Sequence, residues 1–440
     1  MTEKHSEAAV ARVEKPKDSP PDQNQDDSMQ IFASSGDLFE YSADEARVVR
    51  WKLDLILLPM MAITYILSFM DKVALGESSI FGNFGRRSAT NSFAGLSVCR
   101  FFLGAFETCI TPILTILVSQ YWTRGEQPLR ASIWWAGGGV GGFIADSITY
   151  AVSGGAWKGS QYATWQVVFL VFGPISIAWG VFLFFFLPTS PMSAWFLTER
   201  ERKISVMRVA RNHTGIENRK YKLYQVKEAL LDIQVWMLCA QSFLQCIPGG
   251  GLTAFGKIVL QGLGYSDRET VVMGMPANGI QLLINVLAGV ISQVIPNTRC
   301  MMMILANIIV LIGSVLIEIL YVNTIPYIMC MSLISSNIGG FTKKATCAVM
   351  MFISYAVGQI VAPQFFIDSE APTYPTGFRA FYVSVALMIV IELLMVLYLA
   401  RENRKKARSV PSESQAPSGV SSADFQDLTD KEHPHFRYVY

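Results

Sequence analysis

The chain has 440 residues, of which 51% are hydrophobic and only 16% are charged. Soluble globular domains carry about 25% charged residues, so the composition argues against a soluble protein. The formal net charge is +2 and the basic residues form no stripe, which argues against nucleic acid as a partner. The seven cysteines contain no Cys-x-x-Cys pair and lie in or beside apolar blocks, where we expect them to pack as small hydrophobic side chains.

The apolar residues are gathered in blocks, and several blocks reach the length of about 20 residues that crosses roughly 30 Å of hydrocarbon. The block at 326–340 is too short to cross easily, so it is strained, little tilted or incomplete. We therefore expect an all-α protein embedded in the lipid bilayer, with about 9–10 transmembrane helices. The predicted spans are residues 53–70, 93–119, 131–153, 165–187, 235–258, 270–295, 300–321, 326–340, 345–366 and 378–400.

Two polar tails and one basic loop divide the chain. Residues 1–46 and 405–440 are rich in charged residues, Ser and Pro, and both predict disordered tails. The loop at 195–234 separates two groups of spans, and we expect its amphipathic stretches to lie along the membrane surface. The sequence thus predicts an N-terminal helical bundle of four spans at 47–194 and a C-terminal bundle of six spans at 235–404.

The positions of Lys and Arg predict the orientation. If the first tail is cytosolic, alternation of the spans places the loop at 195–234 and the basic cluster at 401–408 on the same side, where positive charge collects. Arg86 and Arg87 are the exception to this pattern. We predict that both termini are cytosolic, and the plasma membrane is favoured over a vacuolar one.

Arg100 and Glu107 are charged residues inside one predicted span, where each charge costs at least about 2.5–3.5 kcal/mol. They are seven residues apart, so they lie on nearly the same helix face, about 10 Å apart along the axis. Gly104 between them permits a ligand or another helix to approach closely. One interpretation is a substrate-anion site at Arg100 and a protonatable carboxylate at Glu107. The other is that neighbouring helices neutralise both, or that Arg100 extends to the interface.

Neutral polar residues form a second set of candidates. Asn278, Gln281 and Asn285 share one helix face, because they recur at spacings of three and four. Such a stripe suits either a water-filled cavity or hydrogen bonds between helices. Asn337 and Gln359 are further candidates for binding substrate or the coupling ion.

Other charged residues have less distinctive surroundings. Asp71 and Lys72 end the first span, where they can lie at the surface or take part in the site. Asp146 lies late in its span, beyond a glycine run that favours tight helix packing. Glu318 and Glu392 interrupt otherwise apolar helices, and we expect them to be partly exposed at helix ends.

Enzyme chemistry finds little support in the sequence. All histidines lie outside the predicted spans, so the helical His clusters of membrane metalloenzymes are missing. The sequence has no phosphate-binding P-loop, which argues against ATP as the energy source. We predict no cofactor and no metal. The remaining function is transport that is either coupled to an ion gradient or passive.

Several motifs occur in the order in which one transporter family has them. Together they resemble, over about residues 47–404, the fungal major facilitator transporters of the anion:cation symporter family, in the allantoate permease-like branch. The motifs are Arg50-Trp-Lys-Leu-Asp54, Tyr65-Ile-Leu-Ser-Phe-Met-Asp71-Lys, Cys99-Arg-Phe-Phe-Leu-Gly-Ala-Phe-Glu107, Phe185-Phe-Leu-Pro-Thr-Ser-Pro191, Ser335-Ser-Asn-Ile-Gly-Gly-Phe-Thr-Lys-Lys344 and Ser369-Glu-Ala-Pro-Thr-Tyr-Pro-Thr-Gly377.

The resemblance implies twelve spans in two six-helix halves and uptake of small organic anions, such as carboxylate vitamins or allantoate, usually with protons. It also implies that Arg100 and Glu107 match the charged pair in the fourth span of the family. This chain departs from the pattern between Met70 and Phe93, where about 20 residues replace two further spans. Because spans one, four, seven and ten of such transporters line the substrate path, the resemblance implies an incomplete N-terminal bundle with one cavity wall exposed.

The sequence therefore favours a proton-coupled secondary transporter of a small organic anion. Three alternatives stay open: a truncated, inactive or regulatory remnant, a chain from which a coding segment has been omitted, and an exporter of a small secondary metabolite. The sequence predicts neither the identity of the substrate nor an oligomeric state.

Overall fold

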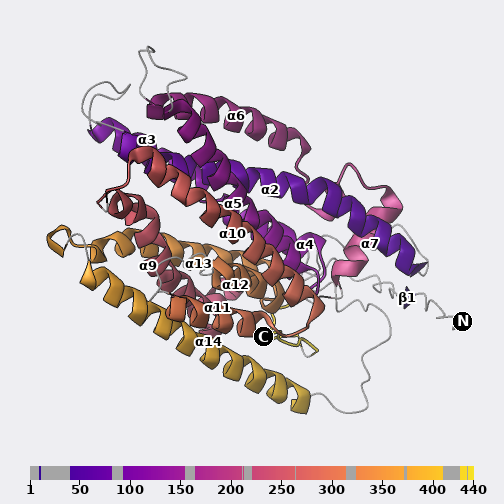
Figure 1. Cartoon of the computed structure of the whole chain (residues 1–440). Helices are drawn as coiled ribbons and strands as arrows, with labels where there is room; N and C mark the ends of the chain where they lie inside the picture. The colour runs from indigo at the N-terminus through magenta and orange to yellow at the C-terminus, as the bar shows by residue number, and fades with distance from the viewer. Residues whose placement is uncertain are drawn as a thin grey trace, which may run out of the picture.

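The computed structural model is almost entirely helical, and its long helices run roughly parallel to one another (Figure 1). A two-residue antiparallel pair joins β1 (Ala9–Val10) to β2 (Glu40–Tyr41). The structure describes residues 9–10, 40–81, 93–153, 164–210, 212, 221–262, 264–313, 324–370, 374–409, 427–433 and 435–440.

The helices fall into two groups joined by two short ones, which lie in the predicted basic loop. The N-terminal group contains α2 (Ala43–Phe81), α3 (Phe93–Glu107), α4 (Ile110–Tyr121), α5 (Gln127–Ala151) and α6 (Thr164–Phe186). The joining helices are α7 (Glu199–Ala210) and α8 (Leu223–Leu231). The C-terminal group contains α9 (Ile233–Gly262), α10 (Asp267–Val294), α11 (Arg299–Gly313), α12 (Thr324–Asn337), α13 (Phe341–Val361) and α14 (Pro375–Ser409).

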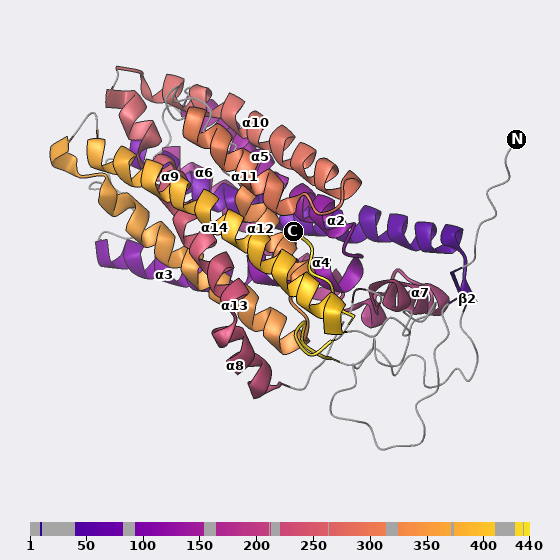
Figure 2. The same cartoon turned by 90° about the horizontal axis from the view of Figure 1, so that it is seen from below.

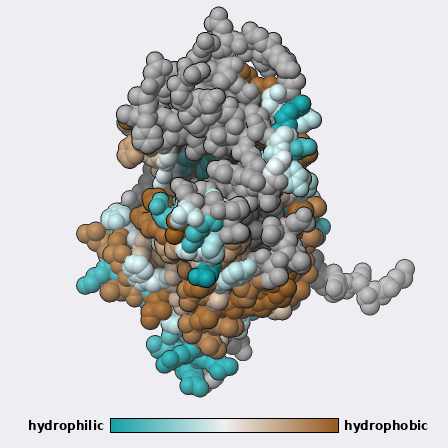
Figure 3. Space-filling view, turned by 60° about the vertical axis from the view of Figure 1, so that its left-hand side comes forward, coloured by the Kyte–Doolittle hydropathy of each residue, from teal (hydrophilic) through white to brown (hydrophobic). Residues whose placement is uncertain are grey.

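Each predicted span corresponds to a helix or a pair of helices. Within the described residues, six helices are long and apolar enough to cross a membrane, and a seventh span results if α8 and α9, which meet at a bend of 65°, are counted together. Apolar side chains, drawn in brown, cover much of the described surface on the face shown in Figure 3, and Leu55, Phe184 and Leu397 are at least 66% exposed. Such surfaces suit contact with lipid, because a bilayer has no water to solvate polar groups.

The short span at 326–340 corresponds to α12. Every residue from 325 to 337 is buried, and the helix is enclosed by α4, α5, α9 and α11. Its 14 residues rise about 21 Å, which is less than the hydrocarbon thickness. A helix surrounded by protein does not have to match the bilayer, which explains why a short span is tolerated here.

The predicted span at 93–119 corresponds to two successive helices, and residues 101–121 of this pair form one span long and apolar enough to cross a membrane. α3 ends at Glu107, and α4 begins at Ile110 after a turn at Thr108 and Cys109. The aromatic side chains of Phe101 and Phe106 on α3 are 71% and 78% exposed. This exposed face agrees with an N-terminal half that holds four spans, because it has no neighbouring helix among the described residues to cover it.

The two predicted disordered tails are wrong in part, because residues 40–46 hold β2 and the start of α2 and residues 405–409 belong to α14. Residues 427–433 and 435–440 are packed as well. Asp427, Asp430 and Phe436 are fully buried, and these residues pack against the ends of α12, α13 and α14. The physical reason is that their polar groups find specific buried partners, which polar composition alone does not reveal. We call this end of the bundle the tail end, and the opposite end the far end.

The expectation that Glu392 is partly exposed is also wrong. Its side chain is fully buried in the middle of α14, which packs against α9 and α11 (Figure 1 and Figure 2). Hydrogen bonds from two neighbouring helices make this burial possible. Glu318 lies outside the described residues.

Candidate functional site

A row of aromatic rings crosses the seam between the two groups of helices. Tyr65 on α2 stacks on Trp135 of α5, with ring centroids 4.9 Å apart. Trp135 in turn lies 4.6 Å from Tyr327 on α12, and Tyr327 lies 5.1 Å from Tyr355 on α13. These offset and tilted contacts are the favourable arrangements for aromatic pairs. We call these four residues the aromatic row, and they hold the two halves together near the middle of the seam.

Glu107 lies beside the aromatic row and is held by α2. The hydroxyl of Ser68 donates a hydrogen bond to Glu107 Oε1, and Lys72 Nζ lies 3.3 Å from the same oxygen. Ser68 and Lys72 share a face of α2 with Tyr65, because they follow it by three and seven residues. The Glu107 side chain is 16% exposed and that of Lys72 is 45% exposed. The sequence predicted Glu107 and left Lys72 open between the surface and the site, and the structure places Lys72 and Ser68 next to Glu107.

The short turn next to Glu107, at which α3 passes into α4 within one span, is a second feature of this site. The Thr108 hydroxyl donates to the carbonyl of Gly104, and the next helix begins at Ile110. A methyl group added at Gly104 would meet nothing within 4 Å, so this face of α3 has room beside it. Arg100 lies on the same helix, but its side chain is outside the part that the structure describes.

Gln359 lies at the other end of the aromatic row, on α13. It is half-buried and interacts with the side chains of Tyr355 and Cys246. Glu107 in turn lies within electrostatic reach of Tyr65 and Tyr355. The predicted residues Glu107 and Gln359 therefore flank one aromatic row, although they come from different halves of the chain.

The polar stripe on α10 lies against other helices. Asn278 Nδ2 donates to Asp146 Oδ2 on α5 at 2.8 Å, and Asn285 Oδ1 accepts a hydrogen bond of 2.7 Å from Thr324. A Cβ on Gly142 would lie 2.7 Å from Asn278 Oδ1, so the helices are in close contact there. Gln281 is buried on the same helix. Of the two interpretations, Asn278 and Asn285 follow the one with hydrogen bonds between helices.

Asn337 lies at the tail end, away from the aromatic row. Its Nδ2 donates to the carbonyl of Val439 at 2.7 Å, and its Oδ1 accepts from the Val439 amide at 2.8 Å. Both polar atoms of this side chain are thus engaged by the backbone of the C-terminal residues. The arrangement fixes the tail and leaves Asn337 little capacity to bind a solute.

An ion pair that the sequence analysis did not identify joins α2, α5 and α10. Arg130 Nη2 and Nε lie 2.6 and 3.1 Å from the two oxygens of Asp54. Trp122 Nε1 donates to Asp54 at 2.8 Å, and Arg130 Nη1 donates to Gln293 of α10 at 2.7 Å. Bidentate Arg–carboxylate pairs of this kind are strong and have a fixed geometry. Asp54 and Arg130 lie near the ends of predicted spans. Charged residues are common there, so the sequence did not mark these two as unusual.

The tail end of the seam is closed by further contacts between the halves. Arg299 on α11 donates to the carbonyl of Arg124 at 2.6 Å, and Ser336 on α12 donates to Gln127 on α5 at 2.5 Å. The Arg124 guanidinium lies 4.1 Å from the centre of the Phe436 ring and donates to the carbonyl of Arg437 at 2.8 Å. Burial, together with repulsion from Arg299, lowers the pKa of Arg124 to about 9.

Three carboxylates at the tail end resemble a metal site. Ligand oxygens of Glu228, Asp232 and Asp430 lie within 4.8 Å of one another. However, Lys343 Nζ lies 2.9, 2.8 and 2.6 Å from these three groups and is itself fully buried. The ammonium group therefore supplies the positive charge that a metal ion would supply.

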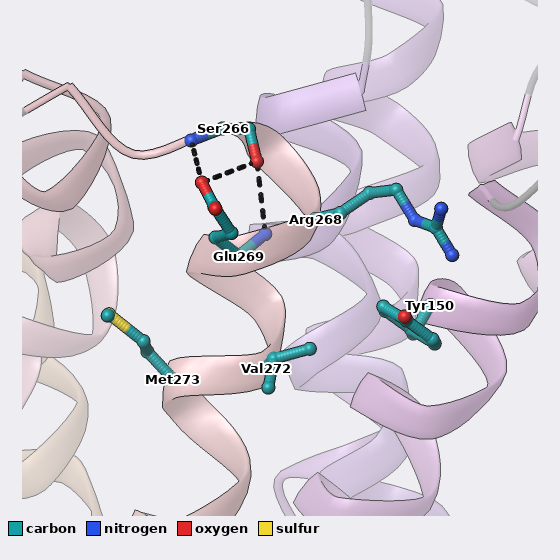
Figure 4. Close-up of a pocket in the computed structure, with 6 residues that line it drawn as sticks. All are labelled: Tyr150, Ser266, Arg268, Glu269, Val272 and Met273. Carbon is teal, nitrogen blue, oxygen red and sulfur yellow. Dashed lines mark hydrogen bonds between the residues drawn. The ribbon is translucent and has the colours of Figure 1, made fainter.

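A pocket of about 380 Å³ lies at the far end, between α5 and α10 (Figure 4). Arg268 lies over the ring of Tyr150, 4.3 Å from its centre, which bridges the two halves. The Glu269 carboxylate accepts hydrogen bonds from the amide and hydroxyl of Ser266, so it caps the start of α10. The polar groups of this pocket therefore stabilise the start of α10 and its contact with α5. The Glu107 site is the stronger candidate, because it holds a charge pair within a span.

Comparison with known proteins agrees with this architecture. Residues 55–366 match the family model described as Major Facilitator Superfamily. The chain is 30% identical to uncharacterized transporter C757.13 of Schizosaccharomyces pombe, over 91% of this chain and 89% of that protein. It is 28% identical to allantoate permease of Saccharomyces cerevisiae, over 94% of this chain and 90% of that protein. The thiamine pathway transporter THI73 of the same yeast is 25% identical, with 95% and 90% coverage.

A solved structure shows the same fold. The proton:xylose symporter XylE, bound to 6-bromo-6-deoxy-D-glucose, superposes with a TM-score of 0.51 at 13% identity, over 80% of this chain and 82% of that chain. The alignments with the S. pombe transporter and the permease extend over 469 and 495 positions, which exceed the 440 residues of this chain. Both relatives therefore hold segments without a counterpart in this chain. The family match over most of the chain, together with its apolar helices, shows that the chain belongs to the Major Facilitator Superfamily and is a multi-pass membrane transporter, not an enzyme.

Proposed function

We propose that this chain carries a small organic anion, such as a carboxylate vitamin or an allantoate-like solute, across the plasma membrane together with a proton. The observation that carries the proposal is the Glu107 carboxylate, which lies between Ser68 and Lys72 beside the aromatic row. A carboxylate and an ammonium group within a membrane-spanning region mark substrate and ion pathways. The similarity to allantoate permease, whose name specifies an anionic solute, supports an anion as the substrate.

Binding of the anion would be coupled to binding of the proton, because the substrate and Glu107 compete for the ammonium group of Lys72. Lys72 is 45% exposed, so an incoming carboxylate can reach its ammonium group. When Lys72 turns from Glu107 to the substrate, Glu107 loses its counter-charge and its charged form becomes less favourable. A proton then binds Glu107, and Arg100 on the same helix would add a second positive charge for the substrate. Anion and proton thus favour the same state of the protein, which is the requirement for coupled uptake.

Movement of the two halves would expose the site to each side in turn. Arg299, Ser336 and Arg130 all bond across the seam at the tail end, which closes the path on that side. Opening it requires these bonds and the contact between Trp135 and Tyr327 to separate. In the orientation that the Lys and Arg distribution predicts, the tail end faces the cytosol, so this closed end would be the cytosolic gate.

Uptake assays test the proposal. Cells that express the chain are given labelled allantoate or labelled carboxylate vitamins at acidic and neutral external pH, and insertion is measured by surface labelling. We expect uptake that rises with acidity and is lost in Glu107→Gln and Arg100→Ala. Glu199→Gln is the matched control, because the Glu199 side chain is 80% exposed on α7. If both variants insert normally and still take up the anion at the rate of the wild type, the mechanism is wrong.

The inactive remnant is the second candidate, favoured by the exposed aromatic face of α3. A folded, inserted chain that moves no labelled anion in either direction would support it, whereas efflux from preloaded vesicles would support an exporter. Sequencing of the transcript separates these outcomes from an omitted segment. An in-frame insertion between Gly82 and Asn91, long enough for two spans with their connections at roughly 60–70 residues, would complete the N-terminal half.

A further inference from the structure

Glu392 is a buried acid inside the C-terminal half, away from the proposed transport site. It lies on α14 and is fully buried, between α9 and α11. The aromatic row and the Glu107 site are built instead on α2, α3, α5, α12 and α13. The proposed transport mechanism does not use Glu392, so its burial needs a separate explanation.

Two neutral amides hold this carboxyl group. Gln241 Nε2 on α9 donates to Glu392 Oε1 at 2.6 Å, and Asn307 Nδ2 on α11 donates to the same oxygen at 2.7 Å. The second carboxyl oxygen, Oε2, is buried and has no hydrogen-bond partner in the described structure. The amide oxygens of Gln241 and Asn307 are likewise buried without a donor. The cluster therefore has three unsatisfied acceptors and lacks a hydrogen atom to share among them.

No cation in the described part of the chain balances the carboxyl group. Among the described residues, none of the ion pairs includes Glu392. The ionisable groups in its electrostatic surroundings are the thiols of Cys300 on α11 and Cys330 on α12. Arg299, at the start of α11, instead donates to the carbonyls of Ser332 and Arg124. An ionised carboxylate that is buried with neutral partners alone is strongly unfavourable, so the group takes its neutral form.

We propose that Gln241, Asn307 and Glu392 form a proton-binding site in the C-terminal half, with the proton carried on Oε2 of Glu392. A protonated carboxyl group gains one O–H donor, which can satisfy one of the orphaned amide oxygens. A carboxylic acid and an amide pair through two hydrogen bonds, because each offers one donor and one acceptor. One bound proton thus removes two of the three unsatisfied acceptors, and it links α14 to α9 and α11.

Infrared spectroscopy of the full chain in lipid nanodiscs tests the proposal directly. The spectrum of Glu392→Gln is subtracted from that of the wild type at neutral pH. We expect the difference to contain the C=O stretching band of a protonated carboxylic acid, which shifts in D₂O. Bands of an ionised carboxylate in its place would overturn the proposal. Glu392→Met is measured in parallel, so that the comparison survives if one variant fails to fold.

Thermal unfolding against pH gives a second, independent reading. If the folded chain holds one more proton than the unfolded chain, stability falls as pH rises. We expect the wild type to lose several degrees of Tm from neutral to alkaline pH and Glu392→Gln to lose clearly less. Glu199→Gln, which removes an exposed carboxylate, should behave as the wild type. Stabilisation of the wild type by NaCl relative to choline chloride, absent in Glu392→Gln, would show a sodium site and overturn the proposal.

Discussion

The ammonium group of Lys72 lies 3.3 Å from the carboxylate of Glu107 and joins α2 to the end of α3. The Ser68 hydroxyl donates to the same carboxylate oxygen. Lys72 is 45% exposed near the end of the first span, where water in the proposed substrate path reaches its ammonium group, and exposed pairs contribute only about 0–1 kcal/mol to stability. A charge pair that adds little to folding, beside an aromatic row in the seam, is better explained by binding.

Replacement of Lys72 by Met should therefore impair transport and leave folding intact. We expect KM for the anion to rise by about tenfold to a hundredfold, because a hydrogen bond to a charged group contributes about 1.5–3 kcal/mol. Initial uptake rates at several substrate concentrations measure KM, and thermal unfolding measures stability. Lys405→Met is the control, since Lys405 is exposed near the end of α14. Equal KM values for the two variants would contradict the role given to Lys72.

The C-terminal residues should stabilise the closed tail end. Phe436 is fully buried and lies under the guanidinium of Arg124, which belongs to the N-terminal half. Phe436→Ala removes this contact, and fully buried Phe→Ala changes cost about 3–5 kcal/mol. We expect amide hydrogen exchange in the segment 333–341 to accelerate by at least about tenfold, because local opening becomes easier.

The comparison variant is Tyr440→Ala, whose half-buried side chain packs against the same core and should accelerate exchange in 333–341 by less than Phe436→Ala. Exchange at the far end, for example in residues 267–275, should be unchanged in both variants. Acceleration that spreads evenly over all helices would instead indicate general unfolding and would contradict a local closing role.

Lys343→Met should convert the three-carboxylate cluster into a metal site. The change leaves Glu228, Asp232 and Asp430 close together without their common ammonium group. Removal of one partner from a buried ion pair costs about 3–5 kcal/mol, so the Tm of the variant should fall. Added Ca²⁺ should restore part of the loss, because grouped carboxylates suit this ion. The wild type should not respond, and the double variant Lys343→Met with Asp430→Asn should lose the rescue.

Gly141→Ala should weaken the contact between α2 and α5. A Cβ at this position would lie 2.6 Å from the backbone carbonyl oxygen of Ile66, so the helices must separate. Overpacking of this kind costs about 1–3 kcal/mol. Gly180→Ala on α6 is the matched control, because its added methyl group would meet nothing within 4 Å. Thermal unfolding of the two variants should show a lower Tm for the first and an unchanged or higher Tm for the second.

The sequence predicted the helices well because hydropathy and span length are local properties. Each predicted span has a helix or a helix pair in the structure, and the short block at 326–340 is α12. The charge at Glu107 was also recognisable, since a carboxylate inside an apolar span is costly wherever the other helices lie. The resemblance to a transporter family rested on motifs along the chain and is confirmed by the family match.

The tertiary structure alone decided which polar groups are partners. Asn337 was a candidate for solute binding, yet both its amide atoms bond to Val439, which is 102 residues away in sequence. Glu392 became a buried group because α9 and α11 bring amides to it, from 151 and 85 residues away. Contacts over such separations depend on which helix faces meet. The sequence by itself therefore determined that the chain is a helical membrane transporter with the charged residue Glu107 in its second span. Helix packing determined which side chains, Ser68 and Lys72, surround that carboxylate.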